Sequence, residues 1–118
     1  MTINETLPLC PDTELTTGDP VAYSEPIEVG PFSQGVVFVS VTELHECTVR
    51  TEVGISPSGY EDWDAHWTSL DLDTTLTRSG MHAIRIHNFG NWLRLRFELE
   101  DQTREAAATV LGWFSGDG

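Results

Sequence analysis

The chain has 118 residues, of which 39% are hydrophobic, so it fits a single domain that can bury an ordinary core. Its 19 acidic residues stand against six basic ones, all of them arginine, and the formal net charge is −13. A field of this sign repels phosphate backbones and anionic membrane surfaces, so we expect neither nucleic acid nor a membrane as a partner.

The acidity has two explanations. A dense acidic surface without lysine stays hydrated in concentrated salt, as adaptation to high salinity requires. A high-GC genome that encodes arginine in place of lysine, together with an ordinary acidic surface that keeps the protein soluble, gives the same composition. Net charge bears on solubility and association rather than on fold, so both explanations stay open.

Segments suited to a membrane or to secretion are not evident in the sequence. The longest apolar run, Val36–Val39, is far too short to cross a bilayer. The first ten residues have neither the basic region nor the sustained apolar segment of a secretory signal, so we expect the chain to stay in the cytoplasm. Cys10 and Cys47 are therefore expected to be reduced thiols, with a bridge between them as the alternative.

The first twenty residues are rich in Thr, Pro, Asp and Glu, and three prolines, Pro8, Pro11 and Pro20, interrupt regular structure. We therefore expect residues 1–20 to form an extended arm, followed by a single β-sandwich domain at residues 21–118. The arm has a few apolar side chains that could dock on a neighbouring subunit, and these are candidate interface residues: Ile3, Leu7, Leu9 and Leu15.

Short strands follow one another along the body of the chain. Alternating or β-branched residues predict strands at Val21–Val29, broken by Pro26, and then at Val36–Leu44 and Thr48–Ile55. An acidic, aromatic loop at 60–66 and a short strand at 67–72 come next. The segment 106–114 is ambiguous, because its three alanines favour helix whereas the residues after them favour a closing strand, which we choose.

The clearest strand pattern lies in Met81–Leu99. Apolar and charged residues alternate on both sides of a short polar connection, a period that belongs to strands and not to helices. Asn88 and Gly90 in that connection tolerate positive φ, so the pattern predicts a β-hairpin with one buried face. Six to eight such strands without a long helical pattern predict an all-β fold, an antiparallel β-sandwich or jelly roll.

Catalytic and metal-binding motifs are not recognised. His82 and His87 lie on opposite faces of a predicted strand, and the chain has no nucleophile elbow, phosphate-binding loop or dinucleotide fingerprint. Carboxylates cluster at Glu61–Asp64 and Asp71–Asp73, but their spacing does not match a calcium loop. We expect a protein without cofactor or metal that is not an enzyme.

Three tryptophans form a candidate aromatic rim: Trp63, Trp67 and Trp92. Aromatic faces of this kind stack on sugar rings in many β-sandwich modules, whereas residues this large more commonly pack in or beside the core.

Four arginines fall on the outward parity of predicted strands and are candidate interface residues: Arg50, Arg85, Arg94 and Arg96. They can pair across strands with Glu52 and Glu98, or form a cationic stripe that binds a partner's carboxylates.

The order of these segments suggests a family. A strand at Gln34–Thr42 is followed by the segment Thr48–Gly59, by a tryptophan, by Ser79-Gly80 and by Phe89–Phe97, which reads aromatic-Gly-x-aromatic-Leu-Arg. From Val21 to Phe114 the layout resembles the small jelly-roll decoration, or cement, proteins of tailed-virus capsids. Discoidin-like and carbohydrate-binding sandwiches show a comparable progression. The chain departs from the viral pattern in its acidity, its lack of lysine and its Glu100-Asp101 turn.

The resemblance implies a virion structural protein that binds the major capsid protein and itself, as a homotrimer on the capsid surface, with an arm that reaches across subunits. The acidity would fit a virus of a halophilic archaeon. A carbohydrate-binding module and a tail or neck component of the virion are the alternatives.

Overall fold

The computed structural model describes residues 4–60, 63–70, 74–87, 89–100 and 106–117. In this part of the chain almost every regular element is a strand. The elements are β1 (Asn4–Thr16), β2 (Val21–Tyr23), β3 (Ile27–Glu28), β4 (Gln34–His45), β5 (Thr48–Ser56), α1 (Trp63–His66), β6 (Thr68–Ser69), β7 (Thr74–Leu76), β8 (Gly80–His87), β9 (Trp92–Glu100) and β10 (Ala107–Asp117).

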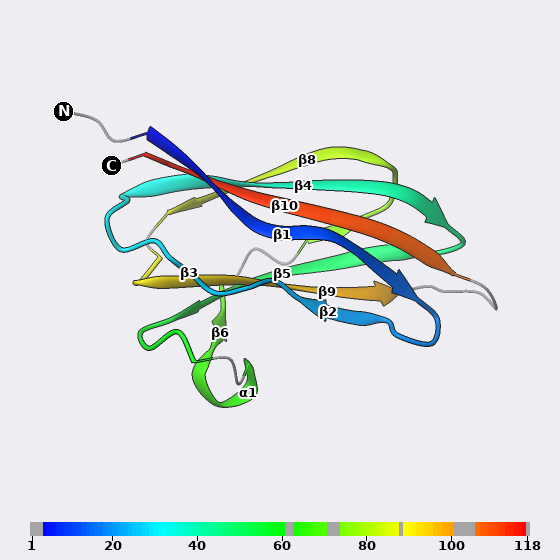
Figure 1. Ribbon diagram of the computed structural model, residues 1–118, viewed down its shortest axis with the longest axis horizontal. Helices are drawn as coiled ribbons and strands as arrows, with labels where there is room; N and C mark the ends of the chain where they lie inside the picture. The colour runs from blue at the N-terminus through cyan, green and yellow to red at the C-terminus, as the bar shows by residue number, and fades with distance from the viewer. Residues whose placement is uncertain (1–3, 61–62, 71–73, 88, 101–105, 118) are drawn as a thin grey trace.

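The strands form two antiparallel sheets that face each other across the core (Figure 1). One sheet has the order β1-β10-β4-β8. In the other, β9 and β5 are central, with β2 and β3 along the outer edge of β9 and with β6 and β7 along the outer edge of β5. Along the chain, the long strands from β4 to β10 alternate between the two sheets. Strands β1 and β10 lie side by side in the same sheet. This wiring is that of a jelly roll, and it confirms the expected all-β sandwich.

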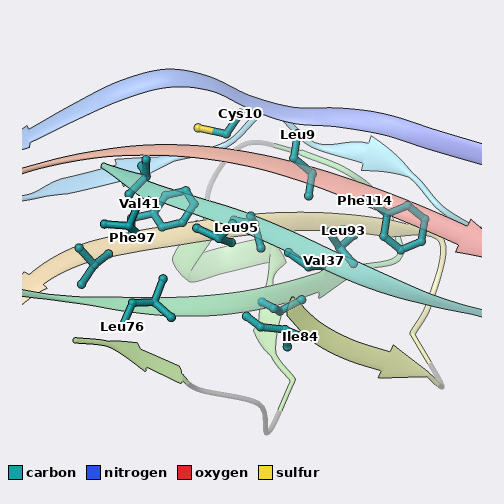
Figure 2. Close-up of a cluster of buried hydrophobic side chains, with 14 of the residues drawn as sticks. Leu9, Cys10, Val37, Val41, Leu76, Ile84, Leu93, Leu95, Phe97 and Phe114 are labelled. Carbon is teal, nitrogen blue, oxygen red and sulfur yellow. The ribbon is translucent and has the colours of Figure 1, made fainter. Parts of the chain in front are cut away.

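The core lies between the sheets and is built from the inward parity of the strands (Figure 2). Along most of β4 and β9 every second residue is buried, whereas the residues between them, apart from Arg94, are partly exposed. The largest fully buried side chains are Phe97, Phe114, Leu15, Ile86, Leu93, Leu95, Val29, Val37, Val39, Val41, Val49 and Val53.

The expected hairpin at Met81–Leu99 is wrong in its pairing, although its buried parity is correct. Strand β8 pairs with β4, whereas β9 pairs with β5, so the two runs belong to different sheets. Their inward residues, such as Ile84 and Leu93, are 7% and 0% exposed and contribute to one core from opposite sides. Alternation identifies the buried face of a strand but not the strand beside it, and the connection here crosses the sandwich.

The expected extended arm is also wrong, because residues 4–16 form β1, an edge strand paired with β10 along its length. Leu9 and Leu15 are 2% and 0% exposed and belong to the core. An edge strand tolerates Pro8 and Pro11, since its outer side needs no ladder of donors, and the register shifts between Pro8 and Thr13 absorb the irregularity.

Other boundaries follow the sequence. The strand expected at Val21–Val29 is split into β2 and β3 around Pro26, and the ambiguous segment after residue 106 is strand β10, whose residues alternate between half-buried and buried. Alanine propensity for helix is overridden there by pairing with β1 and β4 on both sides.

Candidate functional site

The outer face of the β5–β9 pair carries three of the four candidate arginines. The register places Arg50 opposite Glu98, Glu52 opposite Arg96, and Gly54 opposite Arg94. We call this surface the arginine face and define it by Arg50, Glu52, Arg94, Arg96 and Glu98. Opposite charges that face each other across strands stabilise a sheet, each pair by a few tenths to about 1 kcal/mol.

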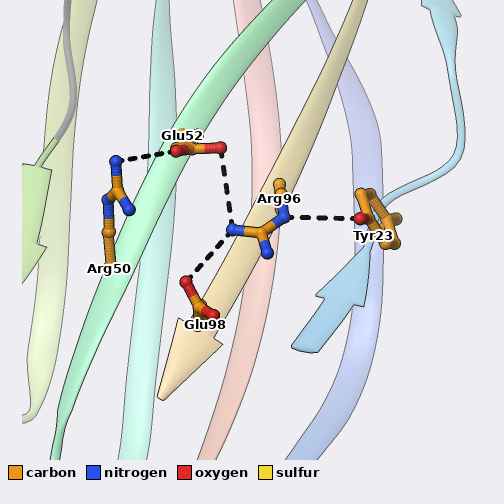
Figure 3. A network of polar contacts seen from close by, with 5 residues as sticks. All are labelled: Tyr23, Arg50, Glu52, Arg96 and Glu98. Carbon is orange, nitrogen blue, oxygen red and sulfur yellow. Dashed lines mark hydrogen bonds and ion pairs between the residues drawn. The ribbon is translucent and has the colours of Figure 1, made fainter. Parts of the chain in front are cut away.

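The charged side chains of this face other than Arg94 form one connected network (Figure 3). Arg50 Nη2 lies 2.9 Å from Glu52 Oε1, and Arg96 Nη1 lies 3.7 Å from Glu52 Oε2 and 3.3 Å from Glu98 Oε2. Arg96 Nε also donates a hydrogen bond of 3.3 Å to the Tyr23 hydroxyl. Burial acts to lower the pKa of Arg96, but its contacts with Tyr23 and Glu98 outweigh burial, and the pKa is raised.

Arg94 has a structural position. Its side chain is outward in register, yet the residue is only 9% exposed. Its Nε donates a hydrogen bond of 2.7 Å to the carbonyl oxygen of Ser24, and its guanidinium carbon lies 4.9 Å from the centre of the Tyr23 ring. This combination of a buried hydrogen bond and a cation–π contact anchors the end of β2 to β9.

The tryptophans do not form one row. Trp63 and Trp67 stack on each other with ring centres 6.1 Å apart and an angle of 8° between the planes, and Trp67 is 8% exposed. Trp92 instead covers Gly59, where a β-carbon would lie 2.6 Å from its ring. The Trp67 indole N–H donates to the carbonyl oxygen of Tyr60. These rings therefore pack against the molecule itself, as large aromatic residues commonly do.

The fourth arginine lies elsewhere. Arg85 is on β8, exposed on the outer face of the β1-β10-β4-β8 sheet, and is thus on the opposite side of the sandwich from Arg50, Arg94 and Arg96. The structure therefore brings together three of the four arginines and pairs them with neighbouring groups of the same chain. The arm candidates divide as well: Leu9 and Leu15 are buried, Leu7 packs against the core, and Ile3 lies outside the described residues.

A second surface was not predicted from the sequence. On the outer face of the β1-β10-β4-β8 sheet, two neighbouring cross-strand rows are largely apolar. We call this the apolar face and define it by Pro8, Phe38, Met81, Ala83, Leu111 and Trp113. Phe38, Leu111 and Trp113 are half-buried, and Met81 is 58% exposed. The available signal was that β4 and β10 carry apolar residues on both parities, which is typical of strands covered on both faces.

Metal-binding groups of three or more His, Cys, Asp or Glu side chains are not found among the residues that the structure describes. Most of the carboxylates considered for calcium, Glu61, Asp62, Asp71 and Asp73, lie outside that part of the chain. Both cysteines are free thiols. Within the described ranges, no helix has the length and apolar character needed to span a membrane.

Comparisons with known proteins place the fold. No protein-family model and no curated protein match the chain. In the crystal structure of the infectious bursal disease virus VP2 subviral particle, a chain matches with TM-score 0.61 at 8% identity, over 98% of this chain and 32% of that one. Our chain thus spans about a third of that protein's length. The crystal structure of PirA matches with TM-score 0.44 at 9% identity, over 93% of this chain and 91% of that one. The first likeness shows that the fold is a β-sandwich shared with a protein of a viral particle.

Proposed function

We propose that the protein is a non-enzymatic structural component of a virus particle, most specifically a capsid decoration protein that binds between shell subunits. The observation that carries this proposal is the likeness of the whole sandwich to VP2 of the subviral particle. A TM-score of 0.61 at 8% identity supports a common fold alone, and the step from fold to role is our inference.

Two features of the surface fit an adhesive role. The charges of the arginine face are paired within the chain, which holds the β5–β9 sheet in one shape. The apolar face offers half-exposed aromatic side chains of the kind enriched at protein interfaces. On a symmetric shell, contacts that are individually weak are repeated many times and add through multivalency.

The proposal is tested on virus particles that are purified from a culture of the host in which the protein is naturally made. We expect mass spectrometry to find the chain in a fixed ratio to the major shell protein, and immunogold labelling to place it over the whole capsid. Labelling confined to one vertex would assign it instead to the tail or neck. Absence of the chain from purified particles would contradict a virion role.

We also propose that the acidic surface adapts the protein to concentrated salt. Exposed carboxylates lie on both sheets, for example Glu14 on β1 and Glu28 on β3, and the chain has no lysine. We expect the melting temperature to rise between low and molar sodium chloride, because screening removes repulsion among the acids. A melting temperature that falls or stays constant would favour the compositional explanation.

A further inference from the structure

We propose that the apolar face is a two-fold interface with a second copy of the chain, in which Arg85 of each copy meets Glu43 of the other. This inference concerns self-association only and does not depend on the viral role. It rests on how charge is distributed around the apolar rows.

The centre of the face is apolar. One cross-strand row contains Pro8, Trp113, Phe38 and Ala83, and the next contains Leu111, Ser40 and Met81. None of these paired residues is acidic, although the chain has 19 acids. Two bodies of charge −13 repel each other, so the surface best able to approach a second copy is one poor in acids.

The two ends of the face carry opposite charge. The cross-strand row next to Phe38 and Ala83, on the side away from Met81, ends in Arg85, which is exposed and lies opposite Val36. The cross-strand row on the other side of the two apolar rows, next to Leu111, contains Thr109, with Glu14 opposite on β1. The Thr109 hydroxyl donates a 3.3 Å hydrogen bond to Glu43. The outermost row, beyond Arg85, has His87 on β8 and Asp117 on β10.

This arrangement is self-complementary. The Arg85 row and the Thr109 row lie at equal distances from the midpoint of the two apolar rows, because each is one row away from them. A two-fold axis through that midpoint, parallel to the sheet and perpendicular to the strands, therefore places the basic row of one copy over the acidic row of the other. It also stacks the apolar rows face to face, as two sheets pack in a sandwich.

The choice of Glu43 as the partner of Arg85 follows from the strand order. Such an axis keeps β8 over β8, and β4 is the neighbour of β8, so the β4 residue Glu43 is closer than Glu14 to Arg85 of the second copy. Glu14 lies on β1, at the far edge of the same sheet. Both Arg85 and Glu43 are exposed, and in the single chain Arg85 has no ion pair with any described residue.

The test measures the oligomeric state of the full chain by analytical ultracentrifugation at physiological ionic strength, where screening limits the repulsion between the two acidic copies to about 8 Å. We expect a dimer, and we expect the charge reversals R85E and E43R each to raise its dissociation constant by roughly tenfold, because each creates two like-charge contacts across the axis. An equimolar mixture of the two variants should restore association. In a mixed dimer the introduced glutamate faces the introduced arginine in one contact, and the native pair is kept in the other.

Controls match each charge change. R50E changes an arginine on the opposite side of the sandwich, and E25R changes an exposed acid that follows β2, and both should leave the dimer unchanged. Circular dichroism verifies that every variant is folded. A monomeric native chain, a trimer of the kind that the resemblance implies, a dimer insensitive to both reversals, or a mixture that stays dissociated would each overturn the proposal.

Discussion

Gly35 and Phe114 fit together so closely that a single methyl group would separate them: a β-carbon on Gly35 would lie 2.4 Å from Cε2 of the Phe114 ring. The ring is held in place on its other sides, with edge-on contacts to Phe32 at 5.5 Å and to Phe89 at 5.8 Å between centres. Gly35 therefore lets β4 pass beside a fully buried aromatic ring at one end of the core.

The first prediction concerns this contact. We expect Gly35→Ala to lower the free energy of unfolding by about 1–3 kcal/mol, because the ring cannot move away without displacing its neighbours. Chemical denaturation followed by tryptophan fluorescence measures the change. Gly18→Ala is the matched control, because a β-carbon there meets nothing within 4 Å. Equal losses for the two variants would show that the close approach is not the cause.

The second prediction tests whether β1 belongs to the sandwich. Leu15 is 0% exposed, so Leu15→Ala should cost about 2–5 kcal/mol of unfolding free energy, as large-to-small changes in a core do. Asp12→Ala, at an exposed position of the same strand, should change it little. If Leu15→Ala melts like the native protein, β1 is a detachable arm after all.

The third prediction concerns the arginine face. Arg96 contacts Glu52, Glu98 and Tyr23, and its side chain is 19% exposed. Arg96→Gln should therefore destabilise the protein by about 1 kcal/mol, with a smaller loss at high salt because the ion pairs are partly screened. Arg78→Gln provides the exposed control. A loss that does not change with salt would mean that packing, and not charge, accounts for the effect of Arg96.

The fourth prediction concerns the thiols. Burial raises the pKa of Cys10 and of Cys47 above the ordinary value of 9.0. Below that pH the thiols are neutral in both states and stability is unaffected. As pH rises past 9.0 the unfolded chain ionises first, so stability falls until the folded pKa is passed. The melting temperature of the double variant Cys10→Ala/Cys47→Ala should fall less steeply with pH above 9.0 than that of the native protein. Equal falls of the two melting temperatures would contradict the prediction.

The sequence predicted the buried residues better than their neighbours. Alternation in β9 correctly assigned Leu93, Leu95 and Phe97 to the core, because side-chain direction is a local property of a strand. The partner of a strand is not local. The expected hairpin between β8 and β9 was wrong for this reason, since two strands that share a core satisfy the same pattern from opposite sheets.

The candidate surfaces show the same division. Pairing of Arg50 and Arg96 with Glu52 and Glu98 was one of the two alternatives that parity allowed. The structure forms such pairs, across strands for Arg96 with Glu52 but along one strand for the other two. The separation of Arg85 from the other arginines depends on which sheet contains β8, which composition and spacing do not encode. The prolines of the first twenty residues indicated an arm because an edge strand and an unpaired segment tolerate proline equally well.

The pairing of β1 with β10 also determines when the molecule can be completed during translation. Asn4 lies opposite Asp117, and the two strands run side by side (Figure 1). Within the described ranges β1 has its sheet partner in β10 alone, so β1 stays without that partner until β10, far along the chain, has emerged from the ribosome. Until β10 emerges, β1 with its leucines and the edge of β4 that pairs with β10 both lack their partner strand. Contacts between residues this far apart in sequence form slowly, so the nascent chain has a late, cooperative closing step during which chaperones would bind it.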